Sequence, residues 1–137
     1  MSDFLDLSNY SKLNQIGKGS FGAVFKICEK STNEIYAAKI SLIELTEDQK
    51  RLMTNLRREV NIISSINHPS ILKFIGYSPV DFTSEPFPVI VTEYSSNGSL
   101  GSIIQLERQS LSPESWNDTK KLINIYGIAS GMSYLHS

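Results

Sequence analysis

The chain has 137 residues, of which 40% are hydrophobic and 20% are charged, and its formal net charge is −1. These values are typical of one globular domain, and they give no electrostatic reason to expect a nucleic-acid or membrane-surface binder. The acidic N-terminus, the lack of an apolar run near the roughly 18 residues of a membrane span, and the single cysteine, Cys28, together favour a cytoplasmic location.

Five segments carry strand-like patterns of β-branched and aromatic residues and are separated by turn-forming residues. They are residues 10–16, 22–29, 34–40, 71–77 and 88–94. The last segment is almost continuously apolar, which predicts a strand buried on both faces.

One helix is predicted between the third and fourth strands. Thr46 and Gln49 form a capping-box pair that opens it, and Asn67-His68-Pro69 ends it after about residue 66. On a helical wheel, one narrow stripe of this helix contains Leu52, Leu56, Glu59 and Ile63.

The last part of the chain predicts helices. Residues 95–98, Ser-Ser-Asn-Gly, indicate a linker and a domain boundary between residues 1–94 and 99–137. Residues 99–108 predict a short helix, and residues 118–136 predict a longer one with Asn117 as its N-cap. The longer helix is apolar on more than one face, so we expect it to need packing partners on several sides.

A glycine-rich segment, Gly17-Lys18-Gly19-Ser20-Phe21-Gly22, lies between the first two strands. Its glycines would let backbone amides approach a polyphosphate closely, although glycines so spaced can also serve only a tight turn. A dinucleotide-binding fold would need a helix after the third glycine. The sequence after Gly22 continues as a strand, which favours a glycine hairpin that covers phosphates.

Lys39 lies on the third predicted strand, and Ala37 is on the same face. The small Ala37 leaves room for a flat ring, and Val24 would form a second wall. Lys39 and Glu59 allow two interpretations. In the structural one, Lys39 is a solvated lysine of a strand and Glu59 lies at the edge of the core. In the functional one, the two residues form an ion pair that directs the Lys39 ammonium at the α- and β-phosphates of a nucleotide.

Three other features allow an ordinary structural interpretation. Thr92-Glu93-Tyr94 is either a plain strand end or a hinge whose backbone, around Glu93 and Ser95, pairs with adenine. We expect His68 to be a structural residue that bonds the backbone next to Pro69, and Cys28 to be a small core hydrophobe.

The order of these parts resembles the catalytic domain of eukaryotic protein kinases. The matching motifs are the glycine loop, Ala37-x-Lys39, the helix with Glu59, Asn67-His68-Pro69, Val91-Thr92-Glu93-Tyr94 and Asn97-Gly98-Ser99-Leu100. The resemblance runs from about Tyr10 to Ser137, and residues 127–136 are most similar to the tyrosine-kinase-like group of Ser/Thr kinases.

The resemblance implies an α+β fold. Residues 1–94 would be the ATP-binding small lobe, with a five-stranded antiparallel sheet and one helix. Residues 95–98 would be the hinge, and residues 99–137 the first helices of an α-rich large lobe.

The resemblance also implies which residues bind ATP. The phosphates would be covered by Gly17, Lys18, Gly19, Ser20, Phe21 and Gly22. Adenine would lie between Ile16, Val24 and Ala37. Lys39, oriented by Glu59, would bind the α- and β-phosphates, with Thr92 as gatekeeper and Glu93, Tyr94 and Ser95 as hinge.

Kinases also have a His-Arg-Asp loop with the catalytic base, and acids and an asparagine that bind Mg²⁺. The sequence contains no His-Arg-Asp and no Asp-Phe-Gly, so we assign no catalytic and no metal-binding residue and expect no phosphotransfer from this chain alone. The implied partners are ATP, with Mg²⁺, and a protein substrate, without nucleic acid or membrane. The alternatives are a non-catalytic, kinase-like interaction module and a truncated gene product.

Overall fold

The computed structural model describes residues 4–20, 22–41 and 49–137, with residues 49–53 described by their backbone alone. A short 3-10 helix, Leu7–Asn9, precedes the first strand. The strands are β1 (Tyr10–Lys18), β2 (Gly22–Glu29), β3 (Ile35–Ser41), β4 (Phe74–Ser78) and β5 (Val89–Glu93). The helices are α1 (Gln49–Ser65), α2 (Leu100–Arg108) and α3 (Asp118–Leu135). Every predicted strand and helix is therefore present, while the predicted cap at Thr46 lies outside the described residues.

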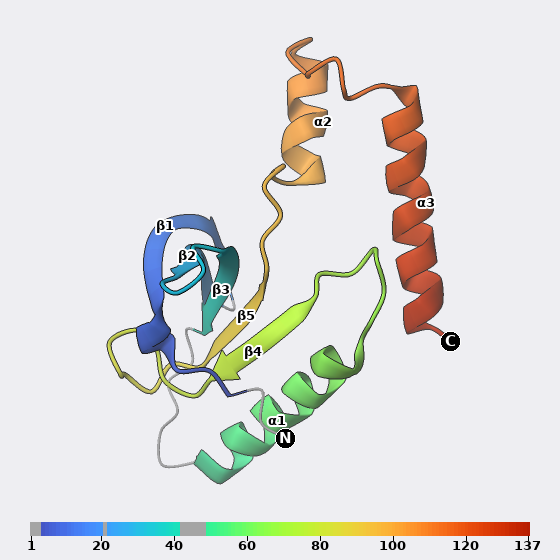
Figure 1. Ribbon diagram of the computed structural model, residues 1–137. Coiled ribbons are helices and arrows are strands. Elements are labelled where there is room, and N and C mark those ends of the chain that lie inside the picture. The colour runs from blue at the N-terminus through green and yellow to red at the C-terminus, as the bar shows by residue number, and fades with distance from the viewer. Residues whose placement is uncertain (1–3, 21, 42–48) are drawn as a thin grey trace. The chain divides into compact units, whose positions relative to one another are not determined.

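The strands form one antiparallel sheet in the order β1-β2-β3-β5-β4 (Figure 1). The pairing of β2 with β3 is regular from Gly22↔Ser41 to Cys28↔Ile35. The five-stranded antiparallel sheet expected from the sequence is confirmed. Strand β5 lies between β3 and β4, but the burial predicted for both of its faces is complete only at Val89 and Val91, because Ile90 and Thr92 are half-buried.

One face of the sheet, which we call the outer face, is covered by the N-terminal segment. Its core consists of Leu7, Tyr10, Ile27, Ala38, Val89 and Val91, with Phe25 and Phe82 packed against it. Phe82 belongs to the loop between β4 and β5. In that loop the Asp81 carboxylate accepts hydrogen bonds from the backbone amides of Thr83 (2.8 Å) and Glu85 (3.0 Å). This loop is thus an ordered turn that helps to close the outer face.

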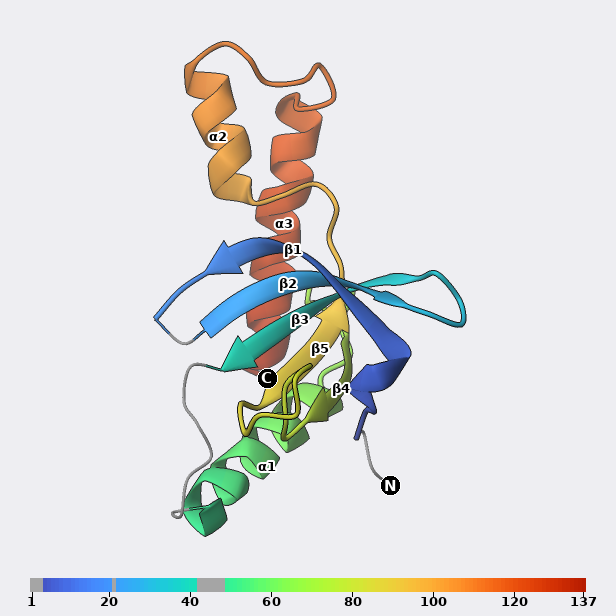
Figure 2. The same ribbon diagram turned by 90° about the vertical axis from the view of Figure 1, so that its left-hand side faces the viewer.

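Helix α1 packs on the opposite face, which we call the inner face, and contacts β4 (Figure 2). Leu56 and Val60 of α1 are buried together with Phe74, and Ile63 and Ile90 pack against them. Neighbouring residues of a strand point to opposite faces. Ile90 therefore faces α1, whereas Val89 and Val91 belong to the outer core.

The chain divides into two compact units, and the second contains Ser95–Ser137 together with His68–Ile71. Within this unit, a Cβ at Gly127 or Gly131 would lie 3.4 Å from the Ser70 side chain, so small residues let the 68–71 segment approach α3. The Ser70 amide donates to His68 Nδ1 (3.0 Å), and His68 Nε2 lies 3.2 Å from Ser130 Oγ. The structural role expected for His68 is confirmed.

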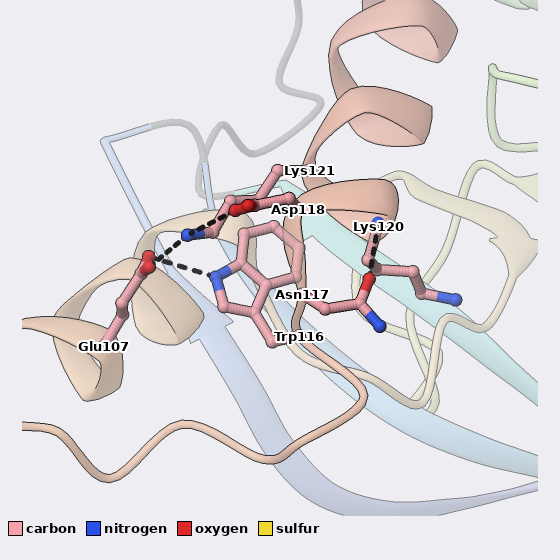
Figure 3. Close-up of polar contacts among 6 residues, drawn as sticks. All are labelled: Glu107, Trp116, Asn117, Asp118, Lys120 and Lys121. Carbon is pink, nitrogen blue, oxygen red and sulfur yellow. Dashed lines mark hydrogen bonds and ion pairs between the residues drawn. The ribbon is translucent and has the colours of Figure 1, made fainter.

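A polar cluster joins α2 to α3 in the second unit (Figure 3). The Glu107 carboxylate accepts a hydrogen bond from the Trp116 indole (3.1 Å) and forms an ion pair with Lys121. Asn117 caps α3 by accepting from the Lys120 amide (2.9 Å), as the sequence predicts. Most apolar side chains of α3 nevertheless remain exposed within the described part of the chain, up to 78% at Tyr126.

Candidate functional site

The strand registers place the predicted nucleotide-binding side chains of the sheet on one face. Val24 pairs with Lys39, and Ala37 pairs with both Lys26 and Thr92. Lys39 also pairs with Ile90, which packs against α1. Paired residues in an antiparallel sheet share a face. Val24, Ala37, Lys39 and Thr92 are therefore neighbours on the inner face, the side of the sheet that α1 occupies.

The glycine-rich segment forms the turn between β1 and β2, as predicted. Lys18 pairs with Ala23, and the Gly19 amide donates to the Gly22 carbonyl (2.9 Å). Strand β2 begins at Gly22, so no helix follows the glycines and the dinucleotide-binding alternative does not apply. Ser20 is an exposed turn residue, and Phe21 lies outside the described residues.

The glycines of this turn differ in what they require. Gly22 has φ +158°, and a Cβ there would overlap the backbone carbonyl oxygen of Ile40 on β3. At Gly17, a Cβ would lie at ordinary contact distances from the Val24 side chain, 3.7 Å from Cβ and 3.8 Å from Cγ2. Packing of the sheet therefore demands glycine at position 22 but not at position 17. Glycine at position 17 instead leaves the backbone open to a ligand.

Ile16, expected to enclose adenine with Val24 and Ala37, lies on β1 with its side chain 43% exposed. Val24 and Ala37 are half-buried. Ile16 lies at an irregularity of the β1–β2 register, and its exposed side chain is available for contact with a flat ring. The adenine role of these three residues stays a prediction.

Glu59 of α1 has an exposed side chain. At 100° per residue, Glu59 lies about 40° outside the stripe that runs from Ile63 to Val60. Val60, rather than Glu59, completes the buried stripe because burial favours the apolar side chain. Lys39 and α1 lie on the same side of the sheet, and the Lys39–Glu59 pair stays a prediction.

The predicted hinge begins where the sheet ends. The register of β3 and β5 stops at Tyr36↔Glu93. Glu93 is anchored to β4 because its amide donates to the Lys73 carbonyl (2.9 Å) and its carboxylate accepts from the Lys73 amide (2.8 Å). The Thr92 hydroxyl donates to the Glu93 carbonyl (3.1 Å), which keeps a second lone pair. The Glu93 amide thus already donates a hydrogen bond to Lys73, whereas the Glu93 carbonyl can accept one more hydrogen bond from a ligand.

The sequence analysis missed one neighbour of this site, Lys26, and its contact with the predicted hinge residue Tyr94. Lys26 follows Val24 on the inner face, and its ammonium lies 5.3 Å from the centroid of the Tyr94 ring. Lys26 could have been found from its spacing, since residues two apart on a strand share a face. Its contact with Tyr94 could not, because Tyr94 lies beyond the last residue of β5.

The comparison with known families agrees with this geometry. Residues 10–137 match the protein kinase domain, and the chain therefore belongs to that family. The fold and the glycine turn define the part of such a domain that precedes its catalytic loop.

Several relatives are protein kinases by name. The chain is 36% identical to serine/threonine-protein kinase TNNI3K of Mus musculus, over 97% of this chain and 15% of that protein. It is 31% identical to serine/threonine-protein kinase 1 of Arabidopsis thaliana, over 95% of this chain and 14% of the relative. Aurora kinase of Saccharomyces cerevisiae is 33% identical, over 96% of this chain and 33% of the relative. The chain thus spans between 14% and 33% of the length of these three relatives.

The part of the chain that the structure describes offers no ligand set for the metal ion of the family. Within residues 4–20, 22–41 and 49–137, no group of three His, Cys, Asp or Glu side chains is arranged to hold a metal. In the same part of the chain, none of the helices combines the length and apolar character that a bilayer crossing requires.

Proposed function

We propose that the inner face of the sheet, from the glycine turn to the hinge, binds ATP. The observation that carries this proposal is the register that makes Val24, Ala37, Lys39 and Thr92 neighbours on one face. An apolar wall with one cation at its end suits a nucleotide, whose base is flat and whose phosphates are negative. If these four side chains were divided between the two faces of the sheet, they could not contact the same ligand.

Each group has a distinct task in this proposal. Gly17 and Gly19 leave room for backbone amides to donate to phosphate oxygens, and Lys39 neutralises charge on the α- and β-phosphates. Val24 and Ala37 contact the side of adenine that faces the sheet. The Glu93 carbonyl accepts from the adenine amino group, and the Ser95 amide donates to the ring. ATP itself supplies the phosphoryl group.

The complete enzyme, in this proposal, is a cytoplasmic Ser/Thr kinase of the tyrosine-kinase-like group that phosphorylates proteins. The catalytic base and the Mg²⁺ ligands come from segments that the 137 residues do not contain. Without them, nothing in the chain orients the substrate hydroxyl or neutralises charge at the γ-phosphate. We therefore expect weak ATP binding and no phosphotransfer from this chain alone.

Titration with a fluorescent ATP analogue tests the proposal. Lys39→Met should weaken binding about tenfold or more, because a hydrogen bond to a charged group is worth about 1.5–3 kcal/mol. Lys120→Met, which removes the same charge from an exposed position of α3, should leave binding unchanged. An equal loss of ATP affinity in both variants would mean that only the net charge of the chain matters, and this result would contradict the proposed ATP site. Transfer of phosphate to a peptide by the purified chain would contradict the expected inactivity.

The exposed apolar side chains of α3 favour a second candidate function, a non-catalytic module that binds another protein. Leu122, Ile125 and Tyr126 are 64–78% exposed, and a contiguous patch of such residues is uncommon on a monomer. Size-exclusion chromatography with and without ATP–Mg²⁺ separates the two functions. A monomer whose melting temperature rises with nucleotide supports the ATP site, and an oligomer indifferent to nucleotide supports the module.

A further inference from the structure

Lys26 is a second cation on the inner face, beside Lys39. It pairs with Ala37, two residues closer to the hinge than the Val24↔Lys39 pair. Ala37 in turn pairs with Thr92, next to Glu93 at the end of β5. Lys39 and Lys26 therefore mark opposite ends of the same row of side chains, the first toward the glycine turn and the second toward the hinge.

Lys26 is directed at an aromatic ring. Its ammonium lies 5.3 Å from the centroid of Tyr94, within the roughly 6 Å over which a cation is attracted to a ring face. Both side chains are half-buried, so water screens the attraction less than it would at an exposed site. The contact joins β2 to the first residue after β5.

This contact has a consequence for the hinge. The sheet anchors Glu93 through two hydrogen bonds to Lys73, whereas Tyr94 has no register partner, because the pairing of β5 with β3 ends at Glu93. The Tyr94 side chain is thus held through Lys26 rather than through the sheet. A backbone that is held in place binds a base more tightly, because less conformational freedom is lost on binding.

We infer that Lys26 is a positioning residue: by holding the Tyr94 ring, it fixes the hinge backbone that receives the adenine end of the nucleotide. The inference rests on the proposed ATP site and extends it. Lys26 acts through Tyr94 and does not itself bind phosphate. Loss of the Lys26 cation should therefore weaken the binding of ligands that contain adenine and leave the binding of ligands that contain only phosphate unchanged.

Two probes separate these effects at constant ionic strength, ATP and inorganic tripolyphosphate. Lys26→Met and Tyr94→Leu should each weaken ATP binding about two- to fivefold, the size of one cation–π contact, and leave tripolyphosphate binding unchanged. Lys26→Arg and Tyr94→Phe, which retain the cation and the ring, should stay close to wild type. The double variant Lys26→Met/Tyr94→Leu should be no weaker than either single variant.

A second measurement tests the contact in the absence of any ligand. A double-mutant cycle by urea unfolding of the whole chain should give a two- to fivefold coupling between Lys26 and Tyr94 in the unfolding equilibrium constant. Equal losses of ATP and tripolyphosphate affinity in Lys26→Met, or no coupling in the cycle, would overturn the inference and leave the ATP site intact. A wild-type chain that binds neither probe would instead overturn the proposed function, and the inference with it.

Discussion

Two glycines of the same turn should respond in opposite ways to an added methyl group. Gly22→Ala places a Cβ against the backbone carbonyl of Ile40, and a backbone atom cannot rotate away as a side chain can. Gly17→Ala places its Cβ at 3.7 Å from Val24 Cβ, which is ordinary van der Waals contact. The first change should damage the sheet, and the second should damage only ligand binding.

The magnitudes follow from these surroundings. Overpacking of this kind costs about 1–3 kcal/mol, and Gly22 also has a φ of +158° that a substituted residue rarely adopts. Gly17→Ala should change the free energy of unfolding by less than about 0.5 kcal/mol. Its methyl group would nevertheless stand between the backbone and a phosphate. We expect ATP to bind about tenfold more weakly, equivalent to one lost charged hydrogen bond.

Urea unfolding followed by circular dichroism measures the stability of both variants, and titration with a fluorescent ATP analogue measures their affinity. We expect Gly22→Ala to unfold at a lower urea concentration than wild type. We expect Gly17→Ala to keep the wild-type urea midpoint and to bind ATP more weakly. A Gly17→Ala variant that is as destabilised as Gly22→Ala, or that binds ATP like wild type, would refute this reasoning.

Three further predictions concern single contacts. Hydrogen bonds from Lys121 and Trp116 lower the pKa of Glu107, so its stabilising contribution is present above the ordinary value of 4.5 and lost as pH falls through the lowered pKa. Fluorescence of Trp116, the single tryptophan, should report this acid transition, and Glu107→Gln should abolish it. The hydrogen bond from Tyr36 to the Glu34 carboxylate raises the pKa of Tyr36 to about 12. The stability that this hydrogen bond contributes is therefore present below the ordinary pKa of 10.0 and lost as pH rises through about 12. An ultraviolet titration of wild type should show one tyrosine that ionises near pH 12, and Tyr36→Phe should lack it. Asn117→Ala removes the cap of α3 and should cost about 1 kcal/mol in urea unfolding, whereas Asn117→Ser should retain most of it.

Much of the fold could be predicted because its local signals agree with the tertiary structure. Strand β2 occupies residues 22–29, as its β-branched and aromatic residues indicate, and Asn117 caps α3 as its position predicts. The attachment of His68–Ile71 to the second unit was not predicted. It depends on Gly127 and Gly131, whose four-residue spacing on α3 could have indicated a close approach.

The candidate site was predicted less completely. Alternation along the strands correctly placed Val24, Ala37 and Lys39 on one face. The exposure of Glu59 was not predicted, because a stripe drawn through Leu52 and Glu59 competes with one drawn through Leu56 and Val60, and burial selects the apolar residue. The contact between Lys26 and Tyr94 joins residues far apart in sequence, one of them beyond the regular sheet, so no local pattern could predict it.

The most direct test of the account is a map of amide chemical shifts by two-dimensional NMR during titration of the chain with ATP. Binding to the inner face predicts the largest shifts at Gly17, Gly19, Lys39 and Ser95, with small shifts at Ile27 and Val91 of the outer core. Lys39→Met should reduce these shifts at the same ATP concentration. Shifts concentrated on the outer face, or none at millimolar ATP, would contradict the claim that this face of the sheet binds the nucleotide.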